Sequence, residues 1–531
     1  MESDTLSDYY IVGIVRSYTG CQIIPKNSLM KTQFSLLSTL LLIIAIFSVS
    51  LTHANTITWG GSTGTGLDWT APGLWTGGVG PVAGDDVVFN TTGTITFSTM
   101  PAGVTYNSLT ISQGTVTLAY SAGSTIVLGG TGTNFTIANG ASLTLATTVN
   151  IFMANGSTAN ISGTLNVGSG CRFKTSATGV VTTVSTTGSI INNGNVTGGS
   201  ASNLYFNGAS SFTENNAASN DTIPTATWAI TSTIYITAAF TSAATMDGFT
   251  RQTFGNVVYN CPGQTSQGTV SLFPGVISNS YTTNIAGNFT VTSTGSGTLY
   301  FRITGSQLTG ITVNLGGNFA MTSGTIDMNN SGLQCPVLLN VGGDFTFSGG
   351  TIKCTSTTSG STSSIILNKT GTQTFAGGGT FTGNNTNPIN FIVSNGTTLQ
   401  MGTGASPANI TGTNVAFTLS SGATLGVTSS AGITATGAAG NIQATGTRSF
   451  SAGNIVYNGT VAQATGSGLT TAANVTFANT LGVTFSVAAT ISGNMAVNTG
   501  AFVLLPTTAV NSSVLSLTLG GTPQAIGTSS Y

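Results

Sequence analysis

The residues of this chain that are best able to do chemistry are few and widely spaced. Its 531 residues include eleven Asp plus Glu, ten Lys plus Arg and one His. Asp85 and Asp86 form the only adjacent acidic pair, and on a strand their side chains would point to opposite faces, which does not suit a paired-carboxylate site. Turn capping is the expected role of this pair, and a calcium contact is the alternative.

Two further combinations of charged residues come nearest to a catalytic group: Asp247 with Arg251, and Asp327 with Asp344 on adjacent repeats. Polysaccharide-cleaving enzymes with β-helical folds typically gather Asp, Lys or Arg along one groove. Asp327 follows an apolar residue expected to face inward, whereas Asp344 precedes one, so the two occupy different repeat positions. We therefore expect no catalytic residues, no cofactor and no enzymatic activity.

Histidine and cysteine chemistry is equally limited. The single histidine, His53, precedes the signal cleavage site predicted below, so the mature chain would have no imidazole as a general base or metal ligand. No CxxC spacing suggests zinc or redox chemistry, and we expect no metal site. An even number of cysteines in an exported chain permits disulfides, but we favour buried free thiols. These cysteines are Cys171, Cys261, Cys335 and Cys354.

The composition predicts an all-β protein with many tight corners. Only 4% of residues are charged, against roughly 25% in a typical globular protein, while 40% are hydrophobic and can form a core. Gly accounts for 73 residues and Pro for only 12. Thr favours strands, whereas Asn and Gly favour turns. The formal net charge of -1, without a basic cluster, makes nucleic acid an unexpected partner.

A repeated phrase defines the expected elements. Residues 316–328 read GGNFAMTSGTIDM and residues 342–354, twenty-six positions later, read GGDFTFSGGTIKC. In each copy, apolar residues alternate on both sides of a glycine, which predicts strand, corner and strand. The corner glycine recurs at Gly114, Gly140, Gly324, Gly350, Gly396, Gly422 and Gly500.

Self-similarity at a fixed period of about 20 to 50 residues is typical of a solenoid. Because the unit consists of strands, we predict a right-handed parallel β-helix with rungs of roughly 26 residues. Inward Phe, Ile, Leu and Val would form ladders, and Gly and Asn would take left-handed corner conformations. A string of β-sandwiches is the alternative, which the strict interval disfavours.

Tryptophans mark the expected N-terminal end. Trp59, Trp69 and Trp75 cluster within seventeen positions of the segment 55–105. An open solenoid end exposes both apolar core and an unpaired edge, so we interpret this segment as a capping module. Carbohydrate stacking is the alternative role, and the candidate glycan or partner contacts are Trp69, Trp75 and Trp228. For Trp228, a core position is the favoured interpretation.

The remaining organisation follows from the regularity of the repeat. We expect a β-solenoid over 106–201, an irregular or inserted segment over 202–280, and a second β-solenoid over 281–531 that is truncated at its C-terminus.

Threonines in the middle of hydrophobic-Thr-hydrophobic triplets are predicted to share one outward repeat position. A regular Thr row could order water, as in ice-binding solenoids. Ala320, Ile392 and Ala496 interrupt the pattern, so ordinary β-propensity is the favoured explanation. The threonines concerned are Thr110, Thr136, Thr290, Thr346 and Thr418.

The N-terminal region resembles a secretory signal. Two lysines precede an apolar run from Leu36 to Leu51, which is followed by THA and then NTITW, so we place cleavage after Ala54. The run is shorter than the ~20 residues of a spanning helix, although an uncleaved anchor is an alternative. No membrane span is expected in the mature chain.

The true start codon is open between Met1 and Met30. A start at Met30 would give a signal peptide of normal length over 30–54 and make 1–29 an upstream extension.

Two groups of motifs resemble known exported proteins. Residues 57–97 (ITWGGSTGTGLDWTAPGLWTGGVGPVAGDDVVFNTTGTITF) are similar to the opening ahead of β-helical passengers in autotransporters and other exported bacterial surface proteins. The GN[FM] and GDF phrases at Asn288, Asn318, Asp344 and Asn494 resemble repeats of very large surface proteins of Gram-negative bacteria. This resemblance implies a surface-attached, adhesin-like β-solenoid. Such proteins usually end in a translocating barrel or a sorting domain, so we expect a fragment or a different attachment route.

These observations together predict a secreted or cell-surface β-solenoid that makes many weak contacts through Ser, Thr and Asn side chains. The expected partners are glycans, host or environmental surfaces, or like molecules. A passive spacer is the main alternative, and a polysaccharide-active enzyme is less favoured.

Overall fold

The computed structural model describes residues 54–130, 132–217, 223–246, 248–249, 252–272, 280–301, 310–330, 332–403, 406–436, 438–505 and 512–524. His53, Asp247, Arg251 and nearly all of the predicted signal segment lie outside the described residues. Residues from Ala54 onward belong to one compact unit.

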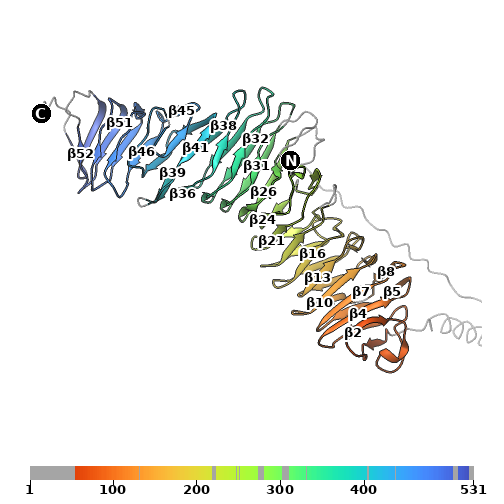
Figure 1. The fold of residues 1–531 in the computed structure, drawn as a ribbon. Helices are drawn as coiled ribbons and strands as arrows, with labels where there is room; N and C mark the ends of the chain where they lie inside the picture. The colour runs from red at the N-terminus through yellow and green to blue at the C-terminus, as the bar shows by residue number, and fades with distance from the viewer. Residues whose placement is uncertain are drawn as a thin grey trace, which may run out of the picture. The chain divides into compact units, whose positions relative to one another are not determined.

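The protein is an all-β parallel solenoid of about 17 turns, with rungs of about 26 residues. The described residues form 54 strands and a single short 3-10 helix, η1 (Pro72–Leu74). Figure 1 shows the strands stacked in chain order from β2 to β52. Most turns contribute one strand to each of three faces, named here faces 1, 2 and 3, and the parallel solenoid predicted from the repeat is confirmed.

Face 1 is continuous along the whole unit, and its strands pair in parallel in chain order. Its strands are β2 (Gly64–Asp68), β4 (Thr94–Thr99), β7 (Thr115–Ala119), β10 (Ser142–Ala146), β13 (Thr164–Val167), β16 (Ser189–Asn192), β19 (Ser211–Glu214), β21 (Thr233–Ile236), β24 (Asn256–Asn260), β27 (Phe289–Ser293), β30 (Phe319–Met321), β33 (Phe345–Phe347), β36 (Gly371–Gly377), β39 (Thr397–Thr403), β43 (Thr424–Val427), β46 (Asn454–Tyr457), β49 (Asn474–Phe477), β51 (Thr490–Val497) and β53 (Ser513–Leu519).

Face 2 consists of two eight-stranded parallel sheets. The first contains β1 (Thr56–Thr58), β3 (Asp86–Phe89), β6 (Ser108–Ile111), β9 (Thr133–Ile137), β12 (Thr158–Ile161), β15 (Val181–Val184), β18 (Leu204–Phe206) and β20 (Thr227–Trp228). The second contains β23 (Thr253–Phe254), β26 (Tyr281–Ile285), β29 (Ile311–Leu315), β32 (Val337–Val341), β35 (Ser363–Leu367), β38 (Ile389–Val393), β42 (Val415–Leu419) and β45 (Arg448–Ser449).

Face 3 consists of three parallel sheets. The first contains β5 (Gly103–Tyr106), β8 (Ser124–Leu128), β11 (Val149–Met153), β14 (Arg172–Lys174) and β17 (Asn195–Thr197). The second contains β22 (Ala244–Thr245), β25 (Thr269–Ser271), β28 (Thr298–Tyr300), β31 (Thr325–Asp327), β34 (Thr351–Lys353), β37 (Thr380–Thr382), β41 (Ile410–Thr413) and β44 (Ile442–Ala444). The third contains β47 (Gln463–Ala464), β50 (Val483–Thr484) and β52 (Val503–Leu504).

Three short strands lie beside this pattern. β40 (Ser406–Pro407) and β54 (Thr522–Pro523) pair antiparallel with β39 and β53, and β48 (Thr471–Ala472) pairs in parallel with β51.

The core is built from ladders of identical or similar apolar side chains. Phe319 pairs in register with Phe345, and the ring centroids are 4.6 Å apart. Phe289 and Phe375 continue this ladder on either side, with centroid distances of 5.8 and 5.5 Å. Aromatic rings that meet in stacked or edge-to-face geometry add a specific contact to the free energy gained from burying their area. The inward ladders predicted from the repeat are therefore confirmed.

The GN[FM] and GDF phrases mark a hydrogen-bonded ladder at one corner. The side-chain oxygen of Asn256 accepts the backbone N–H of Asn288, Asn288 accepts that of Asn318, and Asn318 accepts that of Asp344, at 2.9, 2.8 and 2.7 Å. The bonded residues are 32, 30 and 26 positions apart, so rung length varies while the corner contact is kept. The phrases thus have a structural explanation, since each side chain satisfies a backbone donor of the next turn.

The corner glycines all have positive φ, between +70° and +94°. At Gly350, φ is +92° and an added Cβ would lie 2.7 Å from the carbonyl oxygen of Gly324 on the preceding turn. A larger residue there would meet both a strained backbone and a backbone clash.

The segment 202–280 combines continuity with interruption. Face 1 passes through it without a break, whereas face 2 stops at β20 and resumes at β23, and face 3 stops at β17 and resumes at β22. The Gln252 side chain lies at the break in face 2, where its Oε1 accepts the backbone N–H of Ala226 at 3.0 Å and the indole N–H of Trp228 at 3.2 Å. A side-chain amide therefore replaces backbone pairing at this point.

Candidate functional site

The N-terminal tryptophans form an aromatic cluster over the first turns. Trp59 and Trp75 meet edge to face at 5.1 Å, and Trp69 packs on Trp75 at 5.2 Å and on Phe89 at 5.6 Å. The Trp69 indole donates to the hydroxyl of Tyr106 at 2.9 Å, and burial raises the pKa of Tyr106 to about 12. The three indoles are at most 2% exposed, so neither Trp69 nor Trp75 offers a ring face to a glycan.

Trp228 is also in the core. Its ring stacks on Phe206 at 4.2 Å with an interplanar angle of 5°, and Phe254 lies 5.7 Å away. The side chain is 7% exposed and borders a small hollow of about 270 Å³. Other rings cover Trp228, so it takes the core position favoured from the sequence, and the glycan-contact alternative has no structural support.

Asp85 and Asp86 cap the chain at a corner near the first turns. Asp85 accepts the backbone N–H of Val82 at 2.8 Å. Asp86 accepts the side-chain amide of Asn107 at 2.6 Å and the hydroxyl of Ser108 at 2.5 Å. These contacts agree with the capping role expected from the sequence.

Asp327 and Asp344 lie on different faces. Asp327, in β31 of face 3, is fully buried and accepts the Thr355 hydroxyl at 2.5 Å, and burial raises the pKa of its carboxyl. Asp344 precedes β33 of face 1 and pairs with the ammonium of Lys369 at 2.9 Å. The structure therefore does not bring the two carboxylates together as a catalytic pair.

The four cysteines are buried, and burial raises the pKa of Cys171, of Cys354 and, to about 12, of Cys261. Thiols in this state are protonated at neutral pH and are poor nucleophiles. Within the described ranges, no three His, Cys, Asp or Glu side chains lie close enough together to hold one metal ion.

The predicted shared position of five threonines is wrong. Thr110 pairs with Thr136 on face 2. Thr290 and Thr346 flank Ala320 on face 1, and Thr418 pairs with Ile392 on face 2. The hydrophobic-Thr-hydrophobic triplet occurs on more than one face, so sequence spacing alone mixed residues from different faces.

A different polar row, which the sequence reasoning missed, runs along face 1. Its residues face outward at the first position of successive strands, and each is paired in register with the next. None is charged, and the buried residue that follows each one points into the core. The hydroxyl row consists of Thr94, Thr115, Ser142, Thr164, Ser189, Ser211 and Thr233, and it ends where Thr233 pairs with Asn256, whose side chain belongs to the corner ladder. Four residues of the row directly follow a glycine, in a Gly-Thr or Gly-Ser pair, which was the available signal.

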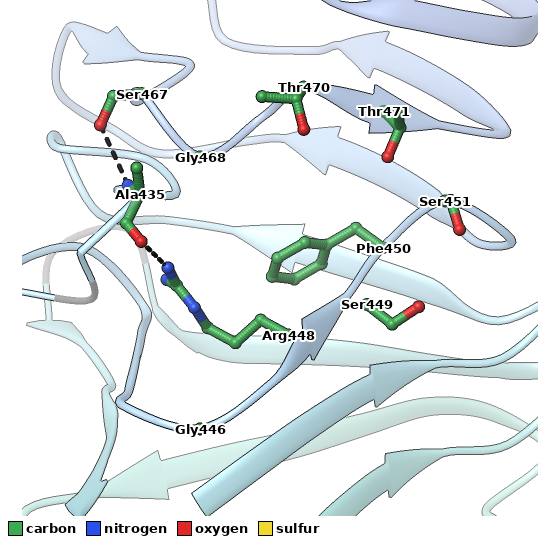
Figure 2. Close-up of a pocket in the computed structure, with 10 residues that line it drawn as sticks. All are labelled: Ala435, Gly446, Arg448, Ser449, Phe450, Ser451, Ser467, Gly468, Thr470 and Thr471. Carbon is green, nitrogen blue, oxygen red and sulfur yellow. Dashed lines mark hydrogen bonds between the residues drawn. The ribbon is translucent and has the colours of Figure 1, made fainter.

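A polar hollow of about 380 Å³ lies near the other end of the unit, between the segments that contain β45 and β48. Figure 2 shows the Phe450 ring within it, with hydroxyl groups on both sides and with Arg448 in β45, two residues before Phe450 on the same segment. The hydroxyl-bearing residues that line it are Ser449, Ser451, Ser467, Thr470 and Thr471.

Backbone carbonyls orient Arg448. Its guanidinium donates to the carbonyl oxygens of Thr434 at 2.6 Å and Ile442 at 3.3 Å, and also to that of Ala435. Desolvation lowers the pKa of Arg448, which still leaves an arginine charged at neutral pH. The one ion pair among the described residues is that of Asp344 with Lys369, so no carboxylate neutralises Arg448 there.

No known protein-family model, curated protein or solved structure matches the chain. The fold places it in the class of parallel β-solenoid repeat proteins. Among the described residues, no helix has the length and apolar character needed to span a membrane.

Proposed function

We propose that this chain is a secreted or cell-surface scaffold that makes multivalent weak contacts to glycans or glycan-coated surfaces. The observation that carries the proposal is the hydroxyl row, which presents uncharged donors and acceptors on seven successive strands of face 1. Neighbouring strands lie about 4.8 Å apart, so the row repeats one weak polar contact at a fixed interval. Multivalency then raises the total affinity without any strong single contact.

The proposed location rests on the sequence. The apolar segment before Ala54 resembles a secretory signal, and the N-terminal and GN[FM] motifs resemble exported surface proteins. A surface that carries so few charges also associates readily with neutral partners. A passive spacer would have the same fold, so binding is the property to test.

The test uses the purified mature chain on immobilised neutral polysaccharides, with retention and released reducing ends recorded together. The row variant carries Thr115→Val, Thr164→Val and Thr233→Val, which remove three hydroxyls but keep the β-branched shape. The matched control changes Thr110, Thr136 and Thr183 of face 2 to Val. We expect at least tenfold weaker retention for the row variant and little change for the control.

Each other result has a clear meaning. If the unmodified chain is not retained on any polysaccharide, a passive spacer is the better explanation. If the row variant and the control variant are retained equally, the hydroxyl row does not bind the polysaccharide. Release of reducing ends would replace the proposal with an enzymatic function.

A further inference from the structure

The polar hollow beside Arg448 has the groups needed for a specific ligand. Its volume of about 380 Å³ lies in the range of ~300–1,000 Å³ that small-molecule sites occupy. It combines an aromatic ring, several hydroxyls and one cation, whereas the outward side chains of the hydroxyl row are all neutral.

The charge of Arg448 is the most informative feature of the hollow. No Asp or Glu follows Asp344 in the sequence, whereas Lys353, Lys369 and Arg448 do. Lys369 pairs with Asp344 at 2.9 Å, and Lys353 lies in register with Asp327, where its charge offsets part of the rise that burial causes in the pKa of that carboxyl. Arg448 is thus the one described cation of this part of the chain that has no carboxylate nearby.

The surroundings of the guanidinium fix its position without neutralising it. Three backbone carbonyls accept its hydrogen bonds, but they carry no net charge. A partly desolvated arginine held in this way is well prepared for a carboxylate, whose two oxygens match its planar array of donors.

The other lining groups favour a sugar as the carrier of that carboxylate. Phe450 is 6% exposed and packs on Phe417 at 5.5 Å, so its ring is a fixed apolar wall of the hollow. Hydroxyls such as those of Ser449 and Thr470 can both donate to and accept from sugar hydroxyls. Arg448 then contacts the acidic group.

We propose that the polar hollow binds a carboxylate-bearing sugar of an acidic polysaccharide, with Arg448 as the carboxylate contact. This inference builds on the proposed glycan-binding function and adds a charged specificity site to the neutral hydroxyl row. It requires that acidic glycans bind more tightly than their neutral counterparts, and that this difference depends on Arg448 and on ionic strength.

The experiment measures binding of a galacturonic acid oligosaccharide and of its carboxyl-reduced, neutral form by calorimetry with the full mature chain. We expect the acidic oligosaccharide to bind at least tenfold more tightly at low salt, and this advantage to shrink at 0.5 M salt. Arg448→Gln should abolish the advantage. Arg172→Gln is the control, because it removes an exposed cation from face 3.

A second variant keeps the contacts of Arg448 with the backbone. Thr471→Glu places a carboxylate at the exposed rim of the hollow, where it repels an acidic sugar, and should reduce acidic-sugar binding at least tenfold. Its thermal unfolding should match that of the unmodified chain. Equal binding of the acidic and neutral oligosaccharides, or unchanged binding by both variants, would overturn the inference.

Two further arms separate the possible explanations. A sulfated oligosaccharide that binds through Arg448 when the carboxylated one does not would overturn the choice of carboxylate. If the hydroxyl row is needed for retention but no binding depends on Arg448, the polar hollow is refuted as a site and the proposed function stands. If acidic-sugar binding depends on Arg448 but the row variant is retained normally, the site is supported and the hydroxyl row is not the glycan contact.

Discussion

The first turns and the last described turns of the solenoid differ in how far their apolar side chains are shielded from water. At the N-terminal end, Trp59, Trp69 and Trp75 are almost completely buried over the first turns. In the last described turns, apolar side chains are exposed by 36% to 75%. These side chains are Phe502, Leu504, Leu505, Val514, Leu515 and Leu519. A solenoid turn buries its apolar face by packing against the group next to it, and the described residues provide such a group at the first turns but not at the last described ones.

The difference lies in what covers the terminal strands. The first turns are covered by large rings that join one another and the strands through ring contacts and indole hydrogen bonds. The last described strand of face 1, β53, pairs with β51, and the described residues on its other side that pair with it are the two of β54. Exposed apolar side chains beside an incompletely paired edge favour association.

Replacing a covering residue should have the largest effect. Trp69→Ala removes a buried ring and its hydrogen bond to Tyr106, and should lower the free energy of unfolding by about 3–5 kcal/mol. Denaturant unfolding measures the loss, and hydrogen exchange should locate it in the first turns. If the protected amides of β2 to β6 exchange at an unchanged rate, the tryptophans do not cover this end in the way described.

Replacing the buried Asp327, in the middle of the solenoid, should change the stability by less than Trp69→Ala does and should increase it. Burial raises the pKa of Asp327, although the hydroxyl of Thr355 and the charge of Lys353 partly lower it. The stability that this group contributes is present below the ordinary pKa of 3.8 and is lost as the pH rises through the raised value.

Asp327→Asn should therefore raise the denaturation midpoint at pH 7, and the gain should disappear as the pH approaches 3. Thr355 can donate to or accept from the new amide, so the hydrogen bond is kept. Denaturant titrations at several pH values measure the difference. A gain that does not depend on pH would exclude titration of Asp327 as its cause.

Changing the exposed end should hardly affect stability. Leu515 is 66% exposed, so Leu515→Ser should alter the free energy of unfolding by no more than about 0.5 kcal/mol. Self-association, measured by sedimentation velocity, should decrease because an apolar group leaves the surface. A loss comparable to that of Trp69→Ala would mean that this end is covered in solution, and the contrast between the ends would fail.

The smallest effect is expected at the exposed ion pair. Although burial raises the pKa of Asp344, hydrogen bonds from the backbone of Thr374 and from Lys369, together with the charge of Lys369, hold it below its ordinary value. This carboxylate contributes stability above pH 3.8 that is lost as the pH falls through the lowered pKa. Solvent screens the pair, so Asp344→Asn should cost less than about 0.5 kcal/mol at pH 7, and the cost should vanish in acid. A loss above 1 kcal/mol would show that the pair holds the corner ladder together.

Much of the architecture was predictable from local patterns. The copies around Gly324 and Gly350 gave the right register because apolar alternation and a left-handed corner leave few ways to stack. The site was much less predictable. Residues of the same type in similar triplets, such as Thr110 and Thr290, lie on different faces, and the exposure of Trp228 depends on rings that are distant in sequence.

The sequence by itself determined the strands, the corners and the stacking interval, because these depend on side-chain alternation and backbone conformation within one rung. It also determined the scarcity of charge that leaves Arg448 without a carboxylate. Only the tertiary structure decided which hydroxyls align into a row, which indoles are covered and which loops enclose the hollow around Phe450. These arrangements depend on contacts between residues of neighbouring turns that are 20 to 32 positions apart in the sequence. Because rung length varies, the sequence pattern within one turn does not show which residues of the next turn will lie beside it.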